Sequence, residues 1–77
     1  MQRLIANYTH ILTDDGPRRL INHVTTIDDD NRLVSVTPFT RELPNTRYID
    51  RPVTILNAAD PNAPITPGTI VTVSLNT

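Results

Sequence analysis

Apolar residues in this 77-residue chain recur with a period of two rather than 3.6. A period of two belongs to the β-strand, in which successive side chains point to opposite faces. Runs rich in β-branched and aromatic residues are typical of strands. Such runs cover residues 4–12, 20–27 and 32–37, with further candidates at 46–49, 53–56 and 69–75. The pattern therefore predicts an all-β protein.

Short turn sequences separate the first three runs. Asp15-Gly16 between two strand-like runs is a strong hairpin signal, and as a two-residue loop it would place Asp14 opposite Pro17. Residues 28–31 read Asp-Asp-Asp-Asn, and such side chains favour turns because they bond their own backbone. We therefore predict a small antiparallel meander that closes, with the later strands, into an open barrel or half-sandwich.

The second half of the chain is less regular. Residues 38–45 are predicted to form a loop with room for one helical turn at 40–43, which Pro44 would end. The proline-rich stretch 58–68 predicts an extended loop. No repeat, linker or low-complexity tract divides the sequence, so residues 1–77 are expected to form a single β domain.

The chain has few ways of stabilising so small a core. A domain of this length buries only about 60% of the surface that its unfolded chain exposes, and small domains usually add disulfides, a metal or a partner subunit. The absence of cysteine excludes disulfides, and two histidines are too few for a structural zinc site without carboxylates. Oligomerisation is the remaining source of stability.

Charge and hydropathy argue against nucleic acids and membranes as partners. Seven arginines and eight acidic residues give a formal charge of −1, and the arginines are scattered rather than clustered. Only three aromatic residues are present, too few for a stacking platform. No apolar run approaches the roughly 20 residues that span a bilayer. We therefore expect a cytoplasmic protein.

The residues that could carry chemistry form no recognisable set. His10 and His23 would be diagonal neighbours on one sheet face, but no carboxylate on the same strands completes a ligand set. A calcium loop beginning at Asp28 would have Leu33 and Phe39 where glycine and glutamate are required. We predict no metal ligand.

Nucleophilic and phosphate chemistry are equally unsupported. The two serines, Ser35 and Ser74, lie at alternating strand positions outside any glycine-framed elbow. With two glycines in all, the chain has no glycine-rich loop to hold a phosphate. We therefore predict no catalytic and no cofactor-binding residue, and no enzymatic activity.

Both faces of the predicted meander are partly apolar, which is more than one small core needs. Surplus apolar surface on a soluble domain usually marks an interface. The candidate interface residues are Tyr8, Ile11, Leu20 and Val24.

Several stretches resemble the N-terminal β-domain of metal-dependent amidohydrolases. They are residues 6–16, which end in Leu-Thr-Asp-Asp-Gly, residues 24–30, residues 32–36, which read Arg-Leu-Val-Ser-Val, and the return strand at 65–73. In that family a His-x-His metal motif and a catalytic barrel follow. Residues 48–53 contain no histidine, so the resemblance implies a β-domain without the catalytic part and transfers no ligand role.

From these observations we expect a non-catalytic structural or protein-interaction domain that self-associates and binds no cofactor. Its partner would be a second copy or another protein chain. The alternative is an accessory β subunit that completes an enzyme supplied by another chain.

Overall fold

The computed structural model describes residues 1–75 and confirms the all-β prediction, since no residue in that range is helical. The predicted helical turn at 40–43 is therefore wrong. The eight strands are β1 (Gln2–Ala6), β2 (Thr9–Thr13), β3 (Gly16–Leu20), β4 (His23–Ile27), β5 (Leu33–Pro38), β6 (Thr46–Ile49), β7 (Val53–Asn57) and β8 (Val71–Leu75).

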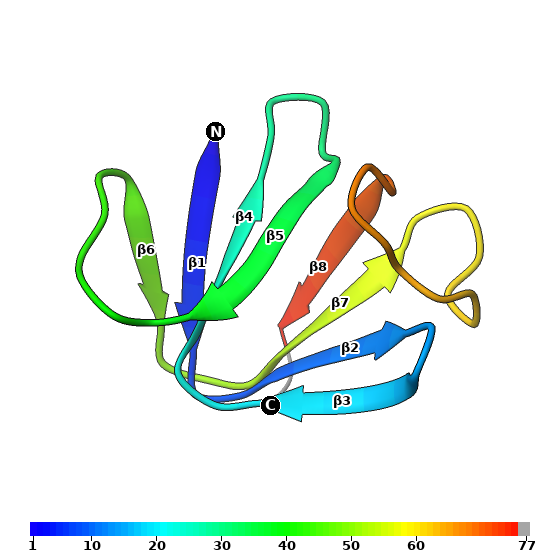
Figure 1. Cartoon of the computed structure of the whole chain (residues 1–77), viewed down its shortest axis with the longest axis horizontal. Helices are drawn as coiled ribbons and strands as arrows, with labels where there is room; N and C mark the ends of the chain where they lie inside the picture. The colour runs from blue at the N-terminus through cyan, green and yellow to red at the C-terminus, as the bar shows by residue number, and fades with distance from the viewer. Residues whose placement is uncertain (76–77) are drawn as a thin grey trace.

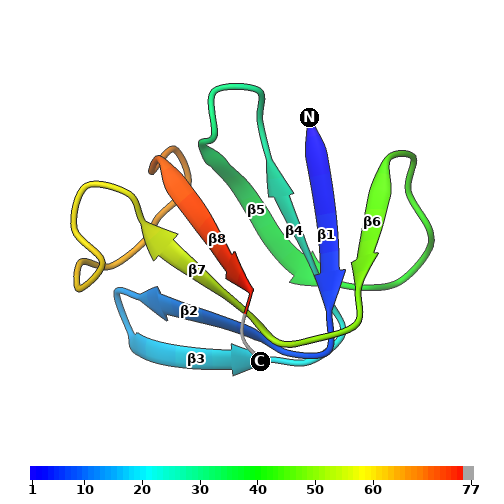
Figure 2. The same cartoon turned by 180° about the vertical axis from the view of Figure 1, so that it is seen from behind.

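The strands form two four-stranded sheets that face each other as an open sandwich (Figures 1 and 2). The first sheet has the order β5-β4-β1-β6, and the second has the order β3-β2-β7-β8. Both sheets are mixed, because β1 pairs with β6 and β2 pairs with β7 in parallel while the other pairs are antiparallel. The predicted antiparallel meander is therefore divided between two sheets.

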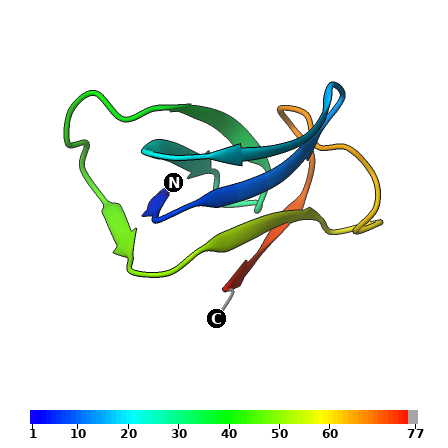
Figure 3. The ribbon, with the colours of Figure 1, turned by 90° about the horizontal axis from the view of Figure 1, so that it is seen from below.

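Two bent segments run side by side through both sheets (Figure 3). One is β1–β2, bent at residues 7–8, and the other is β6–β7, bent at residues 50–52. The bend at 7–8 changes which side chains face inward: Leu4 and Ala6 are buried before it, and Thr9 and Ile11 after it. The predicted strand 4–12 is therefore two strands.

The predicted strand 20–27 is interrupted in the same way. Asn22 adopts φ 57° between β3 and β4, and the chain passes from one sheet to the other there. Asparagine tolerates this left-handed conformation better than most residues because its short amide bonds locally.

The first hairpin is shifted by one residue from the prediction. Thr13 lies opposite Gly16 and Leu12 opposite Pro17, so Asp14 and Asp15 form the loop. Gly16 has φ +107°, a backbone conformation that residues other than glycine rarely adopt. Pro17 lies within β3 rather than before it.

The acidic turn at 28–31 forms where it was predicted. The Asp28 carboxylate accepts hydrogen bonds from the backbone N–H of Asp30 and of Arg32, both at 2.9 Å. Asn31 takes up the left-handed conformation, with φ 63°. These local bonds form the turn that joins β4 to β5.

The hydrophobic core lies between the sheets. It draws on both sheets and on one loop residue, Ile65, whose N–H donates to the carbonyl of Leu12 at 2.8 Å. The proline-rich loop thus covers one end of the sandwich. The buried members are Leu4, Ala6, Ile11, Ile27, Leu33, Val53, Ile55, Ile65 and Val71.

Hydrogen bonds join the sheets along one side. Leu33, at the start of β5, donates to the carbonyl of Thr69 and accepts from the N–H of Gly68, both at 2.8 Å. Val71, at the start of β8, donates to the carbonyl of Asn31 at 2.8 Å. These bonds tie the edges of the two sheets together, and within residues 1–75 the sandwich does not close into a barrel.

Candidate interaction surfaces

The four candidate interface residues fall into two pairs. Ile11 and Val24 are each only 4% exposed, so their side chains are covered within the chain and offer almost no surface to a partner. Tyr8 and Leu20 are half-buried. The Arg19 guanidinium stacks on the Tyr8 ring, 3.9 Å from its centroid. An interface through Tyr8 and Leu20 stays a prediction.

Ile11 and Val24 are buried for different reasons. Ile11 belongs to the core between the sheets. Val24 lies on the outer face of the first sheet, directly opposite Ile5 in β1 and Thr37 in β5. The chain passes from one sheet to the other between β3 and β4, so Ile11 and Val24 lie in different sheets and no single face holds them both.

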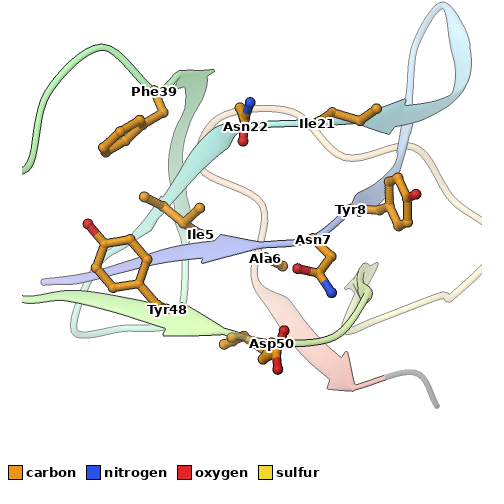
Figure 4. A pocket seen from close by; sticks show the side chains of 10 residues that line it. Ile5, Ala6, Asn7, Tyr8, Ile21, Asn22, Phe39, Tyr48 and Asp50 are labelled. Atoms are coloured by element: carbon orange, nitrogen blue, oxygen red, sulfur yellow. The ribbon is translucent and has the colours of Figure 1, made fainter.

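A hollow of about 670 Å³ lies on the outer face of the first sheet (Figure 4). Phe39 and Tyr48 flank Ile5 at one end, and Ile21 lies at the other. Ile21 and Tyr48 are exposed by 56% and 57%. The hollow combines this apolar surface with polar groups on its rim, namely Asn7, Asn22 and Asp50.

The Tyr48 side chain is hydrogen-bonded to the loop that precedes β6. Its hydroxyl donates to Oε1 of Glu42 at 2.9 Å, and the pKa of Tyr48 is raised above its ordinary value because the neutral phenol makes this bond. The loop itself is anchored to β1 through Arg3, whose guanidinium donates to the carbonyl of Pro44 at 3.0 Å. The phenol is therefore a hydrogen-bonded part of the hollow.

Three of the four sheet edges carry features that oppose strand addition. Proline, charged side chains and short strands protect exposed edges from pairing with another chain. The edge strand β3 contains Pro17, Arg18 and Arg19. The edge strand β6 has only four residues and includes Arg47, and β5 ends in Pro38.

The fourth edge, β8, has none of these features. Its sequence, Val-Thr-Val-Ser-Leu, contains neither charge nor proline. The N–H of Ala58 donates to the carbonyl of Ile70 at 2.9 Å, so Ile70 and alternate residues after it turn their backbone groups toward β7. The backbone groups of Val71, Val73 and Leu75 therefore point to the outer edge. Val71 already donates to Asn31.

Val73 and Leu75 are thus left with outward-pointing backbone groups. Among residues 1–75, no backbone hydrogen bond reaches this part of the edge. Leu75 is 48% exposed at the end of the strand, and Val73 packs partly against the core. The sequence predicted this strand, but its position at an edge depends on pairing with β7, which sequence alternation alone does not reveal.

Residues with catalytic or ligand chemistry are dispersed. His10 lies in β2 and His23 in β4, in different sheets, so the predicted proximity on one face is wrong. His23 Nδ1 is hydrogen-bonded to the carbonyl of Ile21 at 2.9 Å. Within the described part of the chain, no three His, Cys, Asp or Glu residues gather closely enough to hold a metal ion, and no helix is long and apolar enough to cross a membrane.

Comparison with protein-family models, with curated proteins and with solved structures found no match to this chain.

Proposed function

We propose that this chain is a non-catalytic protein-interaction domain that self-associates. The observation that carries the proposal is the β8 edge, which presents the free backbone groups of Val73 and Leu75 without charge or proline. Such an edge is a template for a further strand, and natural proteins protect edges that must stay unpaired. β3, with its proline and two arginines, shows such protection in the same sheet.

The small size of the domain supports the same proposal. A chain of 77 residues without cysteine has few sources of stability beyond its core. Adding a strand from a second copy would satisfy backbone groups at the edge and cover Leu75. Self-association would in this way supply stability that a disulfide or a metal supplies in other small domains.

Light scattering of the purified protein over a dilution series tests the proposal. We expect the mass of a dimer at high concentration and a shift toward the 8.6 kDa chain on dilution. A mass that stays at the single-chain value at every concentration would contradict self-association.

The hollow on the first sheet favours a second candidate, an accessory subunit bound to a different chain. Tyr48 lies in β6, on the sheet that does not contain β8, and Ile21 lies in the connection between β3 and β4. This candidate predicts a single-chain mass for the pure protein and a larger complex in a native lysate. Replacing Ile21 by Ser should disrupt that complex, whereas Leu75→Ser should leave it intact.

A further inference from the structure

We infer that two copies pair through their β8 strands in antiparallel orientation about a two-fold axis that passes between their Ser74 residues. The inference rests on the proposed self-association and names its partner and its register. It follows from three features of β8: which backbone groups are free, which neighbouring segment blocks the edge, and what a two-fold axis requires of the side chains.

The free backbone groups determine the part of the strand that can pair. Among residues 1–75, Val73 and Leu75 point their N–H and carbonyl groups outward and no described residue bonds them, whereas the N–H of Val71 donates to Asn31. An antiparallel arrangement that sets Val73 of one copy opposite Leu75 of the other uses all of these groups. Each such pair exchanges both of its N–H···O bonds, and the two pairs are related by the two-fold axis.

The turn between β4 and β5 excludes the next possible register. Centring the axis on Val73 would place Leu75 of the second copy opposite Val71. That place along the edge is taken by Asn31, whose carbonyl lies 2.8 Å from the Val71 nitrogen. Within residues 1–75, the register centred on Ser74 places no residue of the second copy opposite Val71.

The side chains of β8 suit a contact with an identical strand. A two-fold axis brings each side chain near its own copy or near a close neighbour, so charged residues at the centre would repel each other. β8 is uncharged, in contrast to β3 with Arg18 and Arg19. On the inner face, Leu75, which is 48% exposed, would lie directly opposite Val73 of the second copy and lose much of its contact with water.

The resulting assembly would be one continuous sheet through both molecules. Its strand order would run β3-β2-β7-β8 in one copy and then β8-β7-β2-β3 in the other. The two outer ends would be the β3 strands, which carry proline and arginine. Pairing at β8 would therefore stop at a dimer, since the new ends resist further addition.

The absence of cysteine makes the register testable by disulfide formation. Ser74 and its copy would form a non-hydrogen-bonded pair, whose Cα atoms lie about 4.5 Å apart, within the range that a disulfide spans. Thr72 is the matched control, because it lies on the same strand and is also exposed. In this register, two copies of Thr72 are separated by about 13 Å along the strands, too far for a disulfide.

Under mild oxidation, we expect Ser74→Cys to form a covalent dimer several-fold faster than Thr72→Cys at the same concentration. Equal rates, or faster cross-linking of Thr72→Cys, would overturn the register. If neither variant cross-links while the unmodified protein has the mass of a dimer, pairing through β8 is wrong but self-association stands. If the unmodified protein is monomeric at every concentration, the proposed function itself fails.

Amide hydrogen exchange provides a measurement that needs no substitution. We expect the N–H groups of Val73 and Leu75 to exchange several-fold more slowly in concentrated than in dilute protein. The N–H of Val71, already bonded within the chain, should change less. No concentration dependence at Val73 and Leu75 in a protein that dimerises would overturn the inference.

Discussion

The backbone N–H of Val71 donates to the carbonyl of Asn31 across 2.8 Å, and this bond ties the first residue of β8 to the turn between β4 and β5. The two residues lie in different halves of the sequence. Asn31 lies in a turn of the first sheet, and Val71 lies in a strand of the second. The bond limits how far the β8 edge remains open, so the geometry of the turn affects both the stability of the sandwich and the surface through which copies would pair.

The conformation of Asn31 should therefore matter for stability. Its φ of 63° lies in the left-handed region, which costs a residue with a β-branched side chain about 1–2 kcal/mol. We expect Asn31→Val to lower the free energy of unfolding by about that amount, measured by urea denaturation. Asn31→Gly is the control, because glycine adopts this conformation without strain. Equal destabilisation by both variants would contradict the explanation.

Replacing Thr25 by valine should make the folded protein more stable. Its side chain is 1% exposed, and its hydroxyl has no hydrogen-bond partner among the described residues. An unsatisfied buried polar group costs about 1–3 kcal/mol, and valine replaces the hydroxyl by a methyl group of similar size. We expect Thr25→Val to raise the free energy of unfolding by about 1 kcal/mol.

Thr25→Ala separates the effect of the hydroxyl from that of packing. It removes the hydroxyl but also removes the methyl group and leaves a small cavity, so we expect it to be less stable than Thr25→Val. If Thr25→Val proved less stable than the unmodified protein, the hydroxyl would have to make a favourable interaction.

Tyr48 should titrate above its ordinary pKa of 10.0, because its neutral phenol donates to Glu42. Tyrosinate absorbance in a Tyr8→Phe background follows Tyr48 alone, since the chain has two tyrosines. We expect Glu42→Ala to lower the midpoint, because it removes the acceptor of the phenol hydrogen bond and the nearby negative charge. An unchanged midpoint would show that Glu42 does not cause the raised pKa.

The sign of the pH dependence follows from that pKa. A folded-state pKa raised above the unfolded value means that the folded state retains the phenol proton more strongly. The contribution to stability is then present in full below the ordinary pKa and is lost as the pH rises through the raised one. Since Tyr48 is exposed, salt should weaken the part that comes from the charge of Glu42.

A charge at the β8 edge should dissociate the proposed dimer. Leu75→Lys would place two ammonium groups near the two-fold axis in an edge that is otherwise uncharged. We expect the single-chain mass by light scattering at concentrations where the unmodified protein is a dimer. Val34→Lys is the matched control, because Val34 is 39% exposed on the other sheet's edge strand β5. Dissociation by Val34→Lys alone would move the interface away from β8.

Local patterns in the sequence determined the β-strand character and several boundaries. Residues 46–49 form β6 as predicted, because alternation and turn residues act over a few neighbours. The turn at 28–31 was predictable for the same reason, since the Asp28 carboxylate bonds backbone groups two and four residues away. The absence of cysteine likewise excluded disulfides without a structure.

Only the tertiary structure decided how the strands divide between two sheets. The bend at residues 7–8 reverses which side chains face inward, and it exists because β1 and β2 pair with β6 and β7, more than forty residues away. No local period encodes a partner at that distance. The asparagine at position 22 was a local signal of the break between β3 and β4, because asparagine tolerates the left-handed conformation that it adopts there, with φ 57°. Burial of Ile11 and Val24, and the exposure of the β8 edge, follow from this long-range pairing.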